Sequence, residues 1–179
     1  MDSKIDNKKL YATDNYGKEK NILDFKPDIE GYNNCNKNTN TSNNKSNNRV
    51  DLDLQKNLCF TINDLLTNKE SEFLITYMEK VGFDTIDNEY PSDYRNSLRK
   101  SVFSEVLAET LFNRLLKVFR TSDFENIIPF GFGTEGKWFA TDINPCFRFT
   151  KYYKDHFFKK HKDGGFLIND NHRSILTKH

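Results

Sequence analysis

The chain has 179 residues, which suits one domain, and its 27 basic and 26 acidic residues leave a net charge of about +1. This balance gives no electrostatic case for binding nucleic acid or a membrane surface. No apolar run is long enough to span a bilayer and no signal peptide is visible. Cys35, Cys59 and Cys146 match no zinc, redox or disulfide spacing. We therefore expect a protein of a reducing compartment, the cytoplasm or nucleus, without a membrane partner.

The first part of the chain differs in composition from the rest. Residues 33–48 are a run of Asn, Ser, Thr and Lys whose only apolar anchor is Cys35. Such a segment buries too little apolar area to offset about 1–2 kcal/mol of backbone entropy per residue. We predict a disordered Asn-rich arm over residues 1–52 and an ordered domain over residues 58–179. The arm is either a tether or an insertion without a selected role.

A helix is predicted after residue 67. Thr67-Asn68-Lys69-Glu70 has the pattern of a capping box, in which the Thr hydroxyl and the Glu carboxylate each accept a backbone N–H. Gly82 is a typical C-terminal stop. Apolar residues then fall on one helical face: Phe73, Leu74, Tyr77, Met78 and Val81.

The other predicted elements are shorter or less regular. Leu58, Phe60 and Ile62 alternate with polar or small residues, which indicates a strand. Residues 93–99 read as a loop or short strand, and residues 123–136 as a loop. From residue 137 onward, short aromatic and β-branched runs alternate with turn residues, so strands follow the helices in an α+β fold. A second helix is expected over residues 104–119, with an apolar stripe of Val106, Leu107, Leu111, Leu115 and Val118.

The candidate chemistry lies near the end of the chain, at His161-Lys162-Asp163-Gly164. Side chains two apart on a strand share one face, so His161 and Asp163 could bind one metal ion. Two His and one carboxylate with open positions opposite are typical of non-haem Fe(II) oxygenases. The spacing alone is common by chance, and Asp163-Gly164 is also an ordinary turn pair.

The strand before this motif separates two kinds of side chain. A polar face next to a His-x-Asp suits a strand that lines a wet, charged pocket, although it could also be a solvated sheet face. The two faces are Arg148, Thr150 and Tyr152 on one side, and Phe147, Phe149 and Tyr153 on the other.

Residues 144–152, the His161-Lys162-Asp163-Gly164 motif and Arg173-Ser174-Ile175-Leu176-Thr177 together resemble the prolyl 4-hydroxylase-like branch of the Fe(II)- and 2-oxoglutarate-dependent dioxygenases. The loop Tyr94-Arg95-Asn96-x-x-Arg99 and the helix after it are similar to the N-terminal part of that domain. The resemblance spans roughly residues 58–177. It implies the N-terminal part of a double-stranded β-helix, or jelly roll, with outer helices, incomplete and preceded by the disordered arm.

The resemblance also implies roles for single residues. His161 and Asp163 would be the first two Fe(II) ligands, and Tyr152 would hydrogen-bond 2-oxoglutarate. Thr177 would face the same co-substrate. Phe158 stands where prolyl hydroxylases often carry a Tyr that contacts the substrate. That departure leaves the substrate open among a prolyl residue, another protein side chain and a small molecule.

The implied activity is that of an oxidoreductase that hydroxylates a C–H bond with O2 and 2-oxoglutarate, releases succinate and CO2, and uses ascorbate as a reductant. In the family, a second His and a Lys or Arg follow tens of residues later, whereas this sequence ends at His179. His156, His172 and His179 lie too near His161 to replace the missing ligand. We therefore expect a C-terminally truncated chain that is inactive or impaired.

Two other functions remain open. A degenerate dioxygenase scaffold could serve as a non-catalytic interaction domain. A zinc module is the other alternative, because His and Asp also accept zinc, but a structural zinc site usually needs four ligands with Cys among them, and Cys146 is the only thiol nearby. Nucleic acid is not an expected partner.

Overall fold

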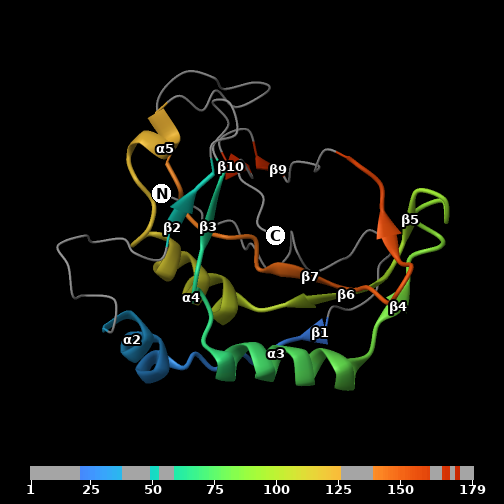
Figure 1. Ribbon diagram of the computed structural model, residues 1–179, viewed down its shortest axis with the longest axis horizontal. Coiled ribbons are helices and arrows are strands. Elements are labelled where there is room, and N and C mark those ends of the chain that lie inside the picture. Colours follow the sequence, from blue (N-terminus) through green and yellow to red (C-terminus); the bar gives the residue numbers. More distant parts are fainter. Residues whose placement is uncertain are drawn as a thin grey trace.

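The computed structural model describes residues 21–37, 49–52, 59–125, 139–161, 167–169 and 172–173. These residues form an α+β structure with short helices and small, mostly antiparallel sheets (Figure 1). The helices are α2 (Ile29–Lys37), α3 (Asn68–Val81), α4 (Glu105–Leu115) and α5 (Ser122–Glu125). The strands are β1 (Asn21–Ile22), β2 (Arg49–Asp51), β3 (Phe60–Ile62), β4 (Asp84–Thr85), β5 (Arg95–Asn96), β6 (Leu98–Phe103), β7 (Cys146–Lys151), β8 (Phe157–Phe158), β9 (Leu167–Asn169) and β10 (His172–Arg173).

Strand β6 is the centre of the main sheet. Its whole length pairs antiparallel with β7, from Leu98 opposite Lys151 to Phe103 opposite Cys146. On its other side, β1 pairs in parallel with one end and β4 pairs antiparallel with the other. The remaining strands form three antiparallel pairs: β2 with β3, β5 with β8, and β9 with β10. Strands and helices therefore alternate along the chain, and the expected order of helices first and strands afterwards is wrong.

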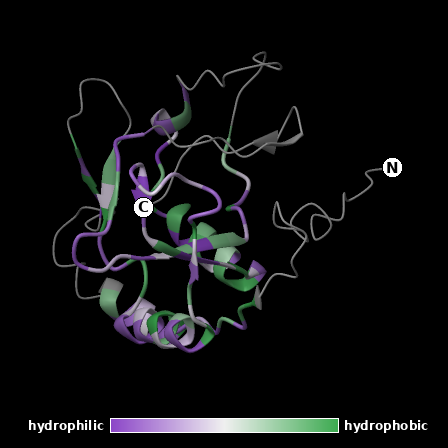
Figure 2. Ribbon diagram, turned by 90° about the vertical axis from the view of Figure 1, so that its right-hand side faces the viewer, coloured by the Kyte–Doolittle hydropathy of each residue, from purple (hydrophilic) through white to green (hydrophobic). Residues whose placement is uncertain are grey.

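Helix α3 confirms its sequence signals. The Thr67 hydroxyl accepts the Glu70 N–H at 3.2 Å, and the Glu70 carboxylate accepts the Thr67 N–H at 2.9 Å. Gly82 ends the helix with φ 81, and its N–H donates to the Met78 carbonyl. Hydrophobic and hydrophilic residues are mixed along α3, at the bottom of Figure 2, because only one of its faces enters the core.

Helix α4 is shorter than predicted. Its N-cap is Ser104, whose hydroxyl accepts the Leu107 N–H, and it ends at Leu115 rather than near residue 119. Leu107 and Leu111 are buried, but Val106 is 45% exposed. Adjacent helical residues point about 100° apart, and Val106 lies on the side of Leu107 that faces away from buried Ala108 and Leu111, so it falls outside the buried stripe. The stretch predicted as a loop from residue 123 overlaps the short helix α5, and residues 126–138 lie outside the described residues.

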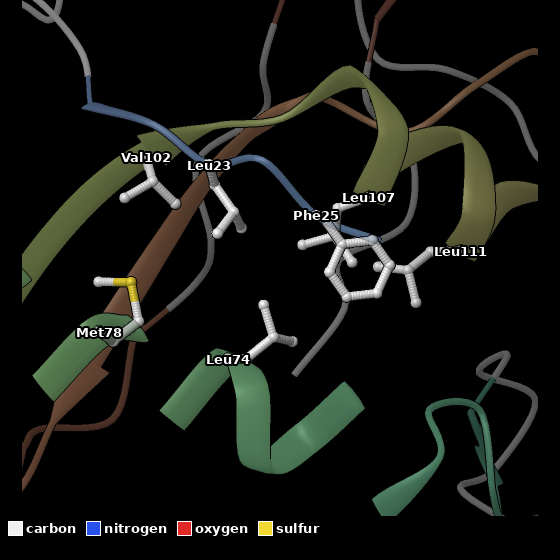
Figure 3. Packing of buried hydrophobic residues seen from close by; sticks show 7 residues of the cluster. All are labelled: Leu23, Phe25, Leu74, Met78, Val102, Leu107 and Leu111. Carbon is white, nitrogen blue, oxygen red and sulfur yellow. The ribbon is translucent and has the colours of Figure 1, made fainter. Parts of the chain in front are cut away.

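The hydrophobic core includes residues of the N-terminal segment that was predicted to be disordered. Leu23 and Phe25 are each only 2% exposed and pack with side chains of α3, α4 and β6 (Figure 3). The predicted disordered arm therefore does not hold for residues 21–37, because alternating apolar side chains give this segment area to bury. Residues 1–20 and 38–48 of that arm lie outside the described residues. So does Leu58, the first residue of the strand that was predicted where β3 is found. The cluster consists of Leu23, Phe25, Leu74, Met78, Val102, Leu107 and Leu111.

A buried ion pair joins the two long helices. The Arg114 guanidinium of α4 donates to both carboxylate oxygens of Glu70 at 2.7 Å, and it also donates to the Leu65 carbonyl. The Glu70 carboxylate further accepts the backbone N–H of Asp28 at 2.7 Å. Burial by itself would raise the pKa of Glu70, but the Arg114 and backbone hydrogen bonds outweigh burial and lower this pKa.

A second buried ion pair connects β2 with α5. Arg49 donates to both carboxylate oxygens of Asp123, at 2.6 and 2.9 Å. Its guanidinium also lies over the Phe60 ring, 3.8 Å from the centroid. The Arg49 hydrogen bond lowers the pKa of Asp123 against the opposing effect of burial. The pair therefore holds β2, and with it β3, against α5.

The packing of Phe25 predicts that residues 21–37 are part of the folded unit. Phe25→Ala should lower the free energy of unfolding by about 3–5 kcal/mol, because it leaves a cavity in the core. The matched control is Ile22→Ala, at a residue that is 76% exposed; it should change stability by less than about 0.5 kcal/mol. Urea unfolding followed by circular dichroism measures both. Equal midpoints for wild type and Phe25→Ala would contradict the packing.

The lowered pKa of Glu70 predicts a loss of stability in acid. A carboxyl group whose pKa is lower in the folded state stabilises the fold fully above its ordinary pKa of 4.5 and loses this effect as the pH falls through the folded value. Glu70→Gln should cost about 3–5 kcal/mol at neutral pH, because it leaves Arg114 buried without a counter-charge. Its stability should then fall less steeply in acid than that of the wild type.

The control for this prediction is the same substitution on the exposed side of the same helix. Glu79 pairs with Lys151 and its side chain is 51% exposed, so Glu79→Gln should cost no more than about 1 kcal/mol. Urea unfolding from neutral pH down to about pH 3 compares the three proteins. A Glu70→Gln curve parallel to the wild-type curve would refute the assigned role of this carboxylate.

Candidate functional site

Strand β7 presents two different faces, as its sequence predicts. Phe147 and Phe149 pack against the core cluster, whereas Arg148 between them is exposed. Thr150 is partly buried, and its hydroxyl lies 3.4 Å from a guanidinium nitrogen of Arg95. The polar face of β7 therefore contacts the β5–β8 pair rather than only solvent.

The candidate co-substrate ligand Tyr152 lies one residue beyond β7, with 47% of its surface exposed. The chain turns immediately after it. Asp155 adopts a left-handed conformation, φ 69, which Asp tolerates better than most residues, and the His156 N–H donates to the Tyr153 carbonyl. The Tyr153 and His156 rings meet edge to face, with centroids 5.3 Å apart.

The candidate metal ligand His161 lies three residues beyond β8 and is exposed. Its ring stacks on Phe158, with centroids 3.6 Å apart and planes 22° apart. Its Nδ1 lies 2.8 Å from the Lys159 carbonyl oxygen. A carbonyl oxygen can only accept, so Nδ1 is the donor in this contact, as it is in a His that binds a metal through Nε2.

Phe158 is the centre of an aromatic cluster at the start of this segment. Strand pairing places Arg95 opposite Phe158, and the Lys159 N–H donates to the Tyr94 carbonyl at 3.0 Å. The Tyr94 and Tyr90 rings meet the Phe158 ring at 5.7 and 6.2 Å between centroids. Sequence reasoning missed this cluster, because residues 93–99 carry a polar pattern whose pairing partner is more than fifty residues away. The aromatic residues on either side of the pattern were the available signal.

The charges around the turn are mainly positive. Lys154, Lys159 and Lys160 are exposed. Lys159 reaches Asp93 at 3.3 Å, with both side chains more than half exposed. Lys151 is bonded to the Glu79 carboxylate, and this hydrogen bond raises the pKa of Lys151. Asp155 lies in the same turn, and Glu79 and Asp93 pair with two of the lysines, so the positive charge around the turn is only slightly in excess.

The predicted metal site stays untested by the described residues. Asp163 and Thr177 lie outside the described residues, so their position relative to His161 stays a prediction. Within the described ranges, no three His, Cys, Asp or Glu side chains gather as a metal site would require. Cys146 lies at the end of β7 opposite to the β7–β8 turn, which argues against the zinc alternative.

Comparison with models of protein families finds no match, and neither curated proteins nor solved structures give one. Among the helices that the structure describes, none has the length and apolar character of a membrane span. A function for this chain must therefore be argued from its own residues.

Proposed function

We infer that the chain is an Fe(II)- and 2-oxoglutarate-dependent dioxygenase domain of the prolyl 4-hydroxylase-like branch. The observation that carries this inference is His161, which sits after β8 with its Nδ1 on the Lys159 carbonyl. Metal-binding His residues usually donate their other ring N–H in this way, which fixes the ring and makes the binding nitrogen more basic.

The strand pairing supports the jelly-roll architecture that this family uses. β7 pairs with β6 in the main sheet, whereas β8, which follows after a short turn, pairs with β5. Only Ser97 separates β5 from β6, so the two pairings continue one antiparallel ribbon past the turn at residues 152–156, and jelly rolls are built from antiparallel strands of this kind. We assign these strands to the N-terminal part of a double-stranded β-helix, with α3 and α4 outside.

The proposal gives each candidate residue one role. His161 would bind Fe(II) through Nε2, and Asp163 would be the second ligand. Tyr152, nine residues before His161 and partly exposed, would donate its hydroxyl proton to a 2-oxoglutarate oxygen. Thr177 would contact the same co-substrate.

Fe(II), when bound, supplies the activation of O2 that converts 2-oxoglutarate into succinate and CO2 and hydroxylates a substrate C–H bond. One oxygen atom enters succinate and the other enters the alcohol product. Ascorbate would keep the iron reduced. The protein itself contributes the ligands, the tyrosine hydroxyl and the aromatic wall around Phe158.

A second candidate function is a non-catalytic interaction domain on the same scaffold. It is favoured by the exposed aromatic side chains around the β7–β8 turn, because clustered exposed apolar surface often marks a contact with another protein. These are Tyr152, Tyr153 and Phe157, with exposed fractions of 47%, 55% and 40%.

Metal binding by the purified chain separates the two functions. Wild type should bind one equivalent of Co(II), used as an air-stable substitute for Fe(II), in equilibrium dialysis. His161→Ala and Asp163→Ala should each weaken this binding at least about tenfold, since even outer-shell partners of metal ligands are worth roughly 10–100-fold in affinity. The proteins are then loaded with Fe(II) without air and exposed to O2 and 2-oxoglutarate. Any release of succinate should be lower in the same two variants than in the wild type.

The matched control is His156→Gln, which removes an imidazole five residues earlier and leaves His161 in place. It should bind Co(II) as tightly as wild type does. Equal Co(II) affinity in wild type, His161→Ala and Asp163→Ala would end the dioxygenase assignment and leave the interaction domain as the better description.

A further inference from the structure

Three arginines are buried among the residues that the structure describes, and one of them differs from the others. Arg49 and Arg114 each form a bidentate pair with a carboxylate. Arg95 is as deeply buried as Arg49, at 8% exposure, but no carboxylate of the described residues forms an ion pair with it. Two of the three buried guanidinium groups are thus paired with a carboxylate. The third, that of Arg95, has no such partner among the described residues.

The surroundings of Arg95 are aromatic rings and hydroxyl groups. Its guanidinium carbon lies 4.2 Å from the centroid of Phe158 and 5.4 Å from that of Tyr90. Its Nε donates to the Ser97 hydroxyl at 3.0 Å, and an Nη lies at a long 3.4 Å from the Thr150 hydroxyl. These neutral contacts occupy only part of the donor capacity of a guanidinium group.

Such an environment suits a charged group that awaits an anion. Removing a cation from water costs several kcal/mol unless an opposite charge and hydrogen bonds offset it. Ring faces offset about 0.5–2 kcal/mol of this cost. A carboxylate matches the planar fork of Arg with two parallel hydrogen bonds, and it would meet apolar walls that strengthen the attraction.

We propose that Arg95 binds the carboxylate group of a ligand beside the Tyr90 and Phe158 rings. The ligand would approach past exposed Lys154 and Lys160, whose positive charges attract an anion. Phe158 contacts both Arg95 and His161, so its ring would separate the bound molecule from the candidate metal ligand. That this molecule is the hydroxylated substrate rests on the proposed function, whereas its binding to Arg95 does not.

The test uses benzoate, which pairs a carboxylate with a ring, and the neutral isostere benzamide. In thermal unfolding of the full chain at constant ionic strength, benzoate should raise the Tm of the wild type in a saturable manner and benzamide should not. Arg95→Met, which keeps the apolar stem, should weaken the benzoate affinity at least about tenfold, because a hydrogen-bonded charge pair is lost. Arg148→Met is the matched control, since Arg148 is exposed, and its response should equal that of the wild type.

Stability without ligand distinguishes a binding role from a structural one. Arg95→Met should have a Tm at or above that of the wild type, because the substitution removes a buried charge without a described counter-charge. Arg114→Met should have a clearly lower Tm. A wild type that fails to respond to benzoate, or an equal response in wild type and Arg95→Met, would overturn the proposal. If Arg95→Met does not fold, Arg95→Lys replaces it in the titration, and it should also bind benzoate more weakly.

Two further arms complete the experiment. A peptide with a free C-terminal carboxylate, compared with its C-terminal amide, shows whether the carboxylate comes from a peptide or from a small acid; selective binding of either acid supports the site. His161→Ala should keep the benzoate response while it loses Co(II) binding. Loss of the anion response with intact Co(II) binding in Arg95→Met would support both proposals, and each can fail without the other.

Discussion

The contact between Glu70 and Arg114 holds helices α3 and α4 together. Glu70 lies in the first turn of α3, where its carboxylate accepts the Thr67 N–H of the capping box, and it also accepts the Asp28 N–H and both arms of Arg114. One side chain thus fixes the start of α3, the segment before α2 and the last turn of α4. A buried carboxylate requires this number of donors, because a single missing partner would leave a charge without compensation. The Tyr32 ring, 3.9 Å from the Arg114 guanidinium, closes the cluster.

The Arg49–Asp123 pair repeats this arrangement at the other side of the described structure. In both cases a guanidinium group binds a carboxylate with two hydrogen bonds and also lies against an aromatic ring. Both pairs join segments more than forty residues apart in sequence. These polar connections restrict how the segments pack, because each of these two buried guanidinium groups needs its carboxylate in place. Arg95 has the aromatic contact without a described carboxylate, and this difference is what marks it for a ligand.

The sequence predicted the local parts of this structure better than the long-range ones. The capping box, the end of α3 at Gly82 and strand β3 follow from interactions within a few residues, and the structure confirms them. The burial of Leu23 and Phe25 could not be recognised in the same way, because their partners in α3, α4 and β6 lie more than forty residues away. The α4 stripe was too wide because Val106 is apolar without facing the core. In each error, the apolar character of the residue was recognised correctly, but the residues that it contacts in the folded chain were not.

The same distinction applies to the candidate site. His161 was found from its residue type and spacing, whereas Arg95 became a candidate only when strand pairing placed it opposite Phe158. Phe158 has no hydroxyl group, and its ring lies against the Arg95 guanidinium. The surroundings of Arg95 therefore suit a carboxylate better than a neutral group, because this guanidinium is a positive charge in apolar surroundings without a described counter-charge.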